Sequence, residues 1–179
     1  MSAPTTPLPR ERPQVSWSLA ALALVVVVAV VLGGWVLADL IRGDTSRQAE
    51  VAERGARVMP FDLDRTTHVF RATPTGGVQE VVSDEPVDHE QVALVRSHLR
   101  EEAVRFAAGD FSDPAAIHGD DMPGLAVLRA RHAEVEVVYA QLAAGARLTY
   151  TAADPVVLEA LHAWFDAQLG DHGGHARSA

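Results

Sequence analysis

The sequence contains neither cysteine nor lysine, and all fifteen of its basic residues are arginine. Without cysteine the protein can form no disulfide, and it has no thiolate for metal binding or nucleophilic catalysis. Without lysine it lacks the residue that forms Schiff bases and the lysine that binds phosphate in a P-loop. The G-x-S-x-G motif of serine hydrolases and the H-E-x-x-H motif of zinc proteases are also absent. These absences leave acid–base, metal-binding and non-catalytic functions open.

Positive charge is scarce in the C-terminal two thirds of the chain. From residue 59 onward nine Arg face nineteen Asp and Glu, which gives a net charge of 9 − 19 = −10. A domain with this charge is expected to repel nucleic acid and anionic lipid headgroups. We therefore predict no nucleic-acid partner, and the charge leaves cationic ligands open.

Charge of either sign is missing from residues 13–38, and this window holds an apolar run from Leu19 to Leu37. A helix over the window would be about 39 Å long, which exceeds the ~30 Å hydrocarbon core of a bilayer. The run also lacks the polar stripe of a soluble core helix. We therefore predict a single-pass transmembrane helix over residues 15–41, which contacts membrane lipid and places the protein in the cell membrane.

A cleaved signal peptide is the alternative for this segment, because Val36-Leu37-Ala38 fits the small-residue rule for cleavage. The long N-terminal flank and a run longer than a signal core of ~7–15 residues favour an uncleaved anchor. Basic residues are nearly balanced on the two sides, so the positive-inside rule decides little about orientation. Because the N-terminal tail is short, we expect it in the cytoplasm and the C-terminal domain outside it.

The rest of the chain divides by composition. Residues 1–14 hold four prolines and are expected to be a disordered tail. Residues 42–58 are rich in charges of both signs and are expected to form a stalk. Residues 59–170 carry regular apolar patterns and predict one folded domain. Residues 171–179 are expected to be a flexible tail.

Within the folded domain the order of elements is ββα-ββα. Two pairs of β-rich segments flank glycine-containing turns and predict two hairpins, residues 67–72 with 78–83 and residues 134–142 with 146–152. Each hairpin is followed by apolar residues at helical spacing, with Asp88 and Asp154 placed to cap the two helices. We predict a small two-layer α+β domain, in which helices cover one face of an antiparallel sheet.

Four segments of this domain resemble a known family: MPFDLDRTTHVF, RSHLREEAVRF, GDFSDPAAIHGDDMPGL and LTYTAADPVVLEALHAWFDAQLGDHG. Over residues 60–172 the chain resembles a family of short uncharacterised bacterial proteins, some of which carry the label aspartate carbamoyltransferase. A known carbamoyltransferase is a longer chain of two α/β domains, with a Ser-Thr-Arg-Thr-Arg phosphate loop and a catalytic lysine. This chain has neither the loop nor a lysine. The resemblance therefore implies a domain boundary and no mechanism.

Three of the eight histidines, together with one methionine, form the best candidate site. His68 lies on the first predicted strand, His98 on the first predicted helix, and His118 and Met122 in the loop that follows. A hairpin, the helix packed on it and the loop leaving that helix can converge. Imidazole and thioether ligands suit a transition metal ion, so we predict a metal site at these four residues. The alternative is that each side chain is solvated or only hydrogen-bonded.

His98 and Glu102 are spaced i, i+4 on the same predicted helix, where we expect a solvated face. No residue is assigned a catalytic role. Together these features predict a membrane-anchored extracytoplasmic module that binds a small ligand, a metal ion or another envelope protein. A small enzyme with a histidine-based site around His68, His98 and His118 is the alternative. A structural role through the anchor and stalk is the third class.

Overall fold

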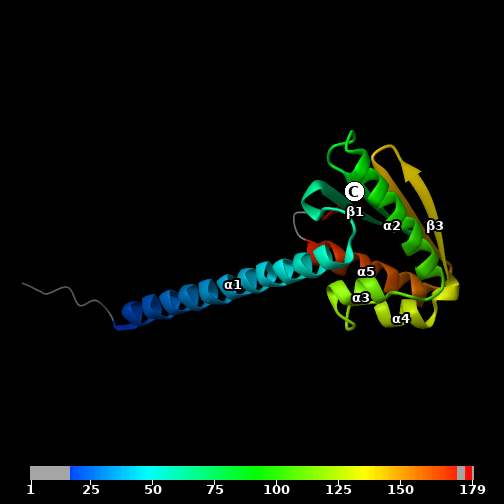
Figure 1. The fold of residues 1–179 in the computed structure, drawn as a ribbon. Helices are drawn as coiled ribbons and strands as arrows, with labels where there is room; N and C mark the ends of the chain where they lie inside the picture. Colours follow the sequence, from blue (N-terminus) through cyan, green and yellow to red (C-terminus); the bar gives the residue numbers. More distant parts are fainter. Residues whose placement is uncertain (1–16, 173–175, 179) are drawn as a thin grey trace, which may run out of the picture. The chain divides into compact units, whose positions relative to one another are not determined.

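The computed structural model describes residues 17–172 and 176–178, and the chain divides into two units, residues 1–43 and 44–179 (Figure 1). Helix α1 (Trp17–Val58) contributes to both units. The predicted disordered tail, residues 1–14, lies outside the described residues. All β-strands of the described chain belong to the second unit, which also holds the candidate functional site.

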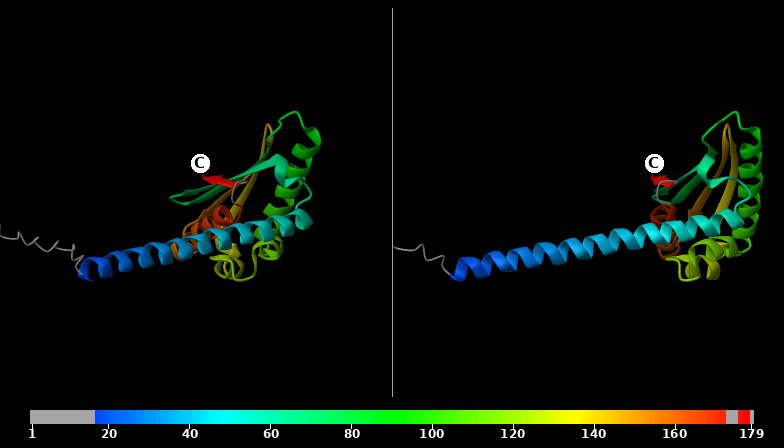
Figure 2. Two further views of the ribbon diagram at one scale, coloured as in Figure 1. Left: turned by 90° about the vertical axis from the view of Figure 1, so that its left-hand side faces the viewer. Right: turned by 60° about the vertical axis from the view of Figure 1, so that its left-hand side comes forward.

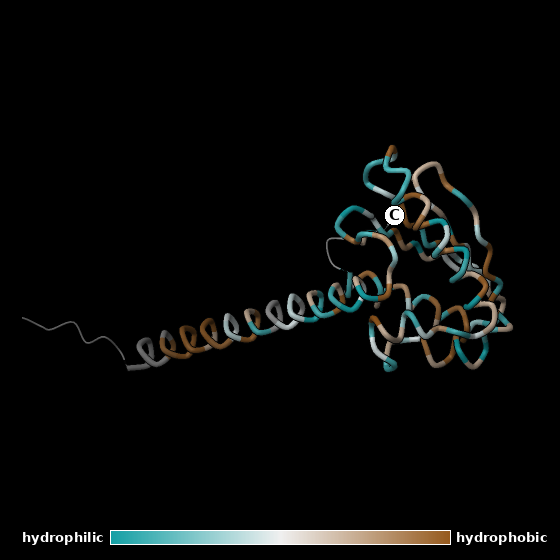
Figure 3. The backbone as a smooth tube through the Cα atoms, viewed as in Figure 1, coloured by the Kyte–Doolittle hydropathy of each residue, from teal (hydrophilic) through white to brown (hydrophobic). Residues whose placement is uncertain are grey.

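Among the described residues, no helix is both long enough and apolar enough to cross a membrane. The predicted single-pass transmembrane helix containing Leu19 to Leu37 is therefore wrong. That prediction rested on the uncharged window that ends at residue 38, but α1 continues past that point without a break, through charged residues, to Val58. Figure 3 shows the change along α1, from hydrophobic residues near its start to hydrophilic residues near its end.

Five strands form one sheet in the second unit, in the order β3-β4-β2-β1-β5. Their bounds are Thr66–Thr73 for β1, Gly76–Ser83 for β2, Val135–Leu142 for β3, Gly145–Ala152 for β4 and Ala176–Ser178 for β5. The first four strands pair antiparallel, which confirms the two predicted hairpins and their union in one sheet. The prediction of a purely antiparallel sheet is wrong at one edge, because β5 pairs parallel with β1. The tail that was expected to be flexible supplies this strand.

The two hairpins join through β2 and β4, whose antiparallel register places Val81 opposite Ala146. Both strands begin with a glycine at a point where neighbouring backbone comes very close. A Cβ atom at Gly76 would lie 1.8 Å from the carbonyl oxygen of Tyr150, and one at Gly145 would lie 2.0 Å from that of Val81. Any larger residue would force the strands apart, so the two glycines fix the junction between the hairpins.

Helices and short 3-10 turns complete the second unit: η1 (Leu63–Arg65), α2 (His89–Ala107), α3 (Ser112–His118), α4 (Leu125–Ala130), η2 (His132–Glu134) and α5 (Pro155–His172). The structure confirms both predicted helix caps. Asp88 accepts a hydrogen bond from the amide of Gln91 at 3.2 Å, and Asp154 accepts one from the amide of Val156 at 2.8 Å. These bonds satisfy amides that the first turn of a helix leaves without an intrahelical acceptor.

Helices α2 and α5 pack on the same face of the sheet, as predicted (Figure 2). The ring of Tyr150 on β4 shows this, because its centroid lies 6.4 Å from that of Phe106 on α2 and 5.9 Å from that of Trp164 on α5. The opposite face carries a half-exposed ion pair between Glu80 and Arg147. The α+β class is therefore confirmed, with the core between the sheet and the two long helices.

Candidate functional site

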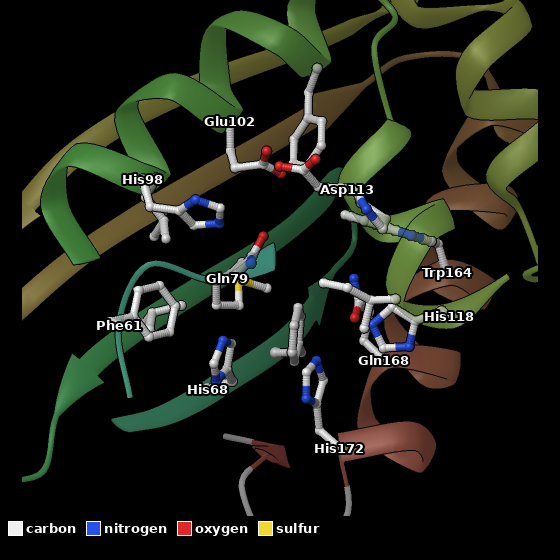
Figure 4. Close-up of a pocket in the computed structure, with 17 residues that line it drawn as sticks. Phe61, His68, Gln79, His98, Glu102, Asp113, His118, Trp164, Gln168 and His172 are labelled. Atoms are coloured by element: carbon white, nitrogen blue, oxygen red, sulfur yellow. The ribbon is translucent and has the colours of Figure 1, made fainter. Parts of the chain in front are cut away.

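A small cavity lies inside the second unit, between the inner face of the sheet and helices α2, α3 and α5 (Figure 4). Its apolar wall consists of Met59, Phe61, Phe70, Val81, Leu99, Phe106, Pro114 and Ile117. Its polar wall consists of His68, Gln79, His98, Glu102, Asp113, His118, Trp164, Gln168 and His172. We call this space the histidine-lined cavity. A small apolar space with several converging polar groups is the usual setting of a ligand site.

The volume of the histidine-lined cavity that is open to the centre of a water-sized sphere is ≈ 20 Å³. One water molecule needs about 10–15 Å³ on the same measure. The cavity therefore has room for one or two waters, or for a ligand of a few non-hydrogen atoms.

Two of the predicted site residues, His68 and His98, face the cavity from different elements. His68 on β1 is 1% exposed and His98 on α2 is 8% exposed. The ring of Phe61 contacts both, with its centroid 5.9 Å from that of His68 and 5.6 Å from that of His98. Burial lowers the pKa of His98, which therefore stays neutral at pH 7. The structure thus brings the two histidines to one cavity, where both contact the same aromatic ring.

The third predicted histidine, His118, reaches the cavity from the end of α3 and lies beside His172. The centroids of these two rings are 5.1 Å apart, and the ring of His172 also stacks on that of His68 at 4.9 Å. Sequence reasoning assigned His172 to a flexible tail and missed it. A signal was present, because Trp164, Gln168 and His172 repeat at intervals of four and so continue the buried face of α5.

Met122, the fourth predicted residue, does not line the cavity. Its side chain is 3% exposed and belongs to the hydrophobic core between the helices and the sheet. A flexible thioether commonly fills such gaps in a core. In the part of the chain that the structure describes, no group of three or more His, Cys, Asp or Glu side chains is arranged to hold a metal ion. The metal site at His68, His98, His118 and Met122 therefore stays a prediction.

A chain of three polar side chains fixes the position of His118. Its Nδ1 lies 2.9 Å from Oδ2 of Asp171, and Arg47 donates to the two carboxylate oxygens of Asp171 at 2.5 and 2.7 Å. Arg47 also donates to the backbone carbonyl of His118 at 3.3 Å. Arg47 belongs to the C-terminal part of α1, so three elements that are distant in sequence meet at this point.

The charges of Arg47 and Asp171 determine which nitrogen of His118 carries the proton. Burial alone would raise the pKa of Asp171, but its hydrogen bonds with Arg47 and His118 outweigh burial and lower the pKa. Burial lowers the pKa of His118 more than Asp171 raises it, so the ring is neutral at pH 7. Because an ionised carboxylate only accepts hydrogen bonds, the single proton of His118 sits on Nδ1. Its Nε2 therefore offers a lone pair.

Glu102 was expected on a solvated face, but its side chain is buried at 6% exposure and lines the cavity. Burial raises its pKa to about 8, helped by the charge of Asp113 and by a hydrogen bond between the two side chains. Asp113 in turn accepts hydrogen bonds from Arg105 at 2.5 and 3.0 Å. Glu102 therefore holds a proton at pH 7. The expectation failed because Glu102 lies on the side of α2 that carries its buried apolar residues, among them Leu99 and Phe106.

Two further groups give the cavity hydrogen-bonding capacity. The indole nitrogen of Trp164 is buried and has no hydrogen-bond partner among the described residues. Gln79 accepts a hydrogen bond from the hydroxyl of Tyr150 at 2.7 Å, which leaves the amide NH₂ of Gln79 to serve the cavity. Figure 4 shows Trp164 and Gln79 among the side chains of the cavity wall. Sequence reasoning identified Trp164 only as a core residue and did not consider Gln79.

No protein-family model, no curated protein and no solved structure matches this chain. The resemblance to the bacterial family with the carbamoyltransferase label stays a prediction.

Proposed function

We propose that this protein binds a small uncharged polar molecule in the histidine-lined cavity. The observation that carries this proposal is the indole N–H of Trp164, which is 1% exposed at the side chain and lacks a hydrogen-bond partner among the described residues. A buried donor without an acceptor costs about 1–3 kcal/mol. A ligand with an acceptor oxygen, such as a carbonyl or hydroxyl oxygen, would remove this penalty on binding.

The protonation of the cavity wall supports an uncharged ligand. His98 and His118 are neutral, Glu102 is protonated, and the carboxylate of Asp113 is balanced by Arg105. A charged ligand would lose its hydration without meeting an uncompensated opposite charge. The net charge of the domain further disfavours anions. The neutral groups offer instead both donors and acceptors, which suits a small amide, ketone or alcohol.

The test uses the full-length chain with Trp17→Phe and Trp35→Phe, so that Trp164 is the only tryptophan. Its fluorescence is titrated with a panel of uncharged amides, ketones and alcohols of a few non-hydrogen atoms. A charged analogue of each compound serves as the matched ligand control. We expect a saturable change with uncharged members only, together with a higher unfolding midpoint. A hundredfold excess of ligand over Kd stabilises the folded state by ~2.7 kcal/mol.

A matched pair of variants locates the binding site. Trp164→Phe retains the aromatic ring and removes the N–H, so it should weaken binding in thermal melts by about 1 kcal/mol or more. Tyr139→Phe removes a hydroxyl from a residue that does not line the cavity and should leave binding unchanged. The proposal is wrong if no member of the panel changes the fluorescence of Trp164 or the unfolding midpoint.

The predicted metal site has a separate test. Zinc or copper ions would raise the unfolding midpoint of the full-length chain if His68, His98 and His118 converge on binding. His118→Gln would then abolish the rise, because it removes a ligand nitrogen. A rise that survives this change would place the metal elsewhere.

A further inference from the structure

We propose that the histidine-lined cavity is catalytic. In this proposal His118 is the base that removes a proton from a carbon next to a carbonyl group, and Glu102 is the acid that protonates the carbonyl oxygen. The substrate class is a small uncharged aldehyde or ketone. This inference rests on the proposed function, because it requires such a molecule to bind in the cavity.

The base is defined by geometry. His118 is 2% exposed, and its Nδ1 is held by the carboxylate of Asp171 at 2.9 Å. No described residue hydrogen-bonds to Nε2, so that lone pair is available to a molecule in the cavity. A carboxylate that holds the far nitrogen of an imidazole fixes the tautomer and stabilises the imidazolium that forms when the base takes a proton.

Asp171 and Arg47 are positioning residues in this arrangement. The Asp171 side chain is 9% exposed, and Arg47 binds it through two nitrogens, so the carboxylate has little freedom to turn away from His118. Without the carboxylate, the proton of His118 can move to Nε2, and the base would be lost. A base held by a second group is the arrangement expected of an acid–base site.

The acid lies on another wall of the same cavity. Glu102 reaches it from α2 and Asp113 from α3, and burial together with the charge of Asp113 raises the pKa of Glu102 to about 8. Arg105 lies 3.5 Å from Glu102 and binds Asp113 directly, so it balances the negative charge that remains after the proton leaves. The indole N–H of Trp164 is a second donor for the oxygen on which charge develops.

The proposed step is balanced in atoms and electrons. Nε2 of His118 takes a proton from the carbon next to the carbonyl, and the electron pair of that C–H bond forms a carbon–carbon double bond. The π pair of the carbonyl moves to oxygen, which takes the proton from Glu102. The product is an enol, and the reverse step returns a proton to carbon and one to Glu102. No oxidant or reductant is needed.

The test measures exchange of hydrogen for deuterium with the full-length protein in D₂O. The probes are hydroxyacetone, acetone and propanal, and the loss of their α-proton signals is followed by ¹H NMR. Binding of each probe is measured in parallel by thermal melting. We expect at least one probe that binds to exchange ~100-fold or more faster than in buffer, within the range typical of positioned acid–base groups.

Variants assign the roles. His118→Gln should reduce exchange to the rate in buffer, and Asp171→Asn should reduce it ~100-fold or more because the wrong nitrogen then carries the proton. Glu102→Gln should slow exchange while retaining binding. His89→Gln, at an exposed position outside the cavity, is the matched histidine control and should exchange normally. Should His118→Gln fail to fold, His118→Ala with added imidazole tests the same role, since the free base can restore exchange.

The pH profile separates a catalytic role from a structural one. The charged and titratable groups that act on Glu102 are Arg105 from α2, Asp110 and Asp113 from the segment that follows, and Tyr150 from β4. Exchange should fall around pH 8, where Glu102 loses its proton. Glu102→Gln should abolish the fall above pH 8. Probes that bind without exchanging would overturn this inference and leave the proposed function intact, whereas absence of binding would overturn the proposed function itself.

Discussion

At the scale of single residues, Glu102 and Asp171 show how position changes the behaviour of a carboxyl group. Glu102 is surrounded by apolar side chains and another carboxylate, and its pKa rises to about 8. Asp171 is also poorly exposed, but Arg47 and His118 bind it, and its pKa falls below the ordinary value. Two carboxyl groups near one cavity are therefore held in opposite protonation states, so Glu102 can donate a proton while Asp171 accepts a hydrogen bond from His118.

The raised pKa of Glu102 predicts a specific dependence of stability on pH. In the unfolded chain its pKa is about 4.3. Between that value and about 8 the unfolded state is ionised at Glu102 and the folded state is not. The unfolded state then binds fewer protons, so stability falls as pH rises through this window. Glu102→Gln has no such titration and should reduce the loss of unfolding free energy between pH 5 and pH 8 by roughly 2–4 kcal/mol.

The measurement is urea denaturation of the wild type and the Glu102→Gln variant at both pH values. Glu101→Gln is the matched control, because Glu101 is exposed on the same helix. The Glu101→Gln variant should retain the full pH dependence of the unfolding free energy seen in the wild type. If the free energy of unfolding changes equally between pH 5 and pH 8 in all three proteins, Glu102 is ionised in the folded state at neutral pH.

At the scale of elements, α5 connects the core of the domain to its cavity. Trp164 and Phe165 of this helix pack against the sheet, and Gln168 and His172 reach the cavity one and two turns later. Its first turn is capped by Asp154, whose carboxylate also lies 2.9 Å from Arg131. A helix with a fixed start and a buried face holds its last turn, and therefore His172, in a defined place.

Substitutions in α5 should separate the cap from the core. Asp154→Ala removes an acceptor for two helix amides, at 2.8 and 3.3 Å, and should reduce the free energy of unfolding by ~1 kcal/mol. Trp164→Ala removes a large buried ring and should reduce it by ~3–5 kcal/mol. Chemical denaturation of the full-length chain measures both. Similar small effects would show that the ring is not part of the core.

The C-terminal part of α1 contacts the rest of the second unit through buried and polar residues, including Gln48, which donates to the carbonyl of Gly170 at 3.2 Å. Val51 is 1% exposed, and Arg47 is bound to Asp171 on α5. Arg57 instead pairs with Glu53 on the exposed side of the same helix. Because exposed ion pairs contribute little to stability, only the first of these two arginines should hold the helix in place.

Amide hydrogen exchange, read by mass spectrometry, tests this difference. Arg47→Gln should increase exchange over residues 44–58, because the helix loses its link to Asp171. Arg57→Gln should leave exchange in that segment nearly unchanged. Faster exchange in the second variant alone would mean that the exposed pair holds the segment.

At the scale of the whole molecule, the chain divides into two units, and the boundary along the sequence lies between residues 43 and 44. The second unit contains the whole sheet, its covering helices and all residues of the histidine-lined cavity. It also contains Arg47, which the cavity needs for the orientation of Asp171. A fragment of residues 44–179 therefore contains all the strands of the described chain, the lining of the cavity and the contact between Arg47 and Asp171.

This division predicts independent folding. A fragment of residues 44–179 should unfold with the same midpoint as the full-length chain, within about 2 °C, because each kcal/mol lost would lower the midpoint by ~4 °C. Calorimetry of both proteins measures this. A second fragment that starts at residue 59 is the matched comparison and should melt earlier, since it lacks Arg47 and Val51. Equal midpoints for the two fragments would mean that residues 44–58 add nothing to stability.

Several features of this protein follow from the sequence by itself, because the interactions behind them are local. Alternating residues around glycine-containing turns determined both hairpins, and Asp88 and Asp154 marked the first turns of two helices by bonding to amides two or three residues away. The apolar face of α5 was also visible as a repeat of three and four residues. The same local reasoning failed for the uncharged run in α1, where composition was taken as proof of a membrane span.

The candidate site was decided by the tertiary structure. His118 meets a partner 53 residues away at Asp171, and Arg47 reaches the backbone of His118 across 71 residues. Sequence spacing gives no measure of such contacts, so His172 was missed and Met122 was included although it belongs to the core. Glu102 was expected on a solvated face, but the packed domain buries it in the cavity wall beside Asp113 of α3. Local sequence patterns thus determined the helices and strands. The protonation state and the neighbours of each polar side chain instead depended on tertiary packing against residues distant in sequence.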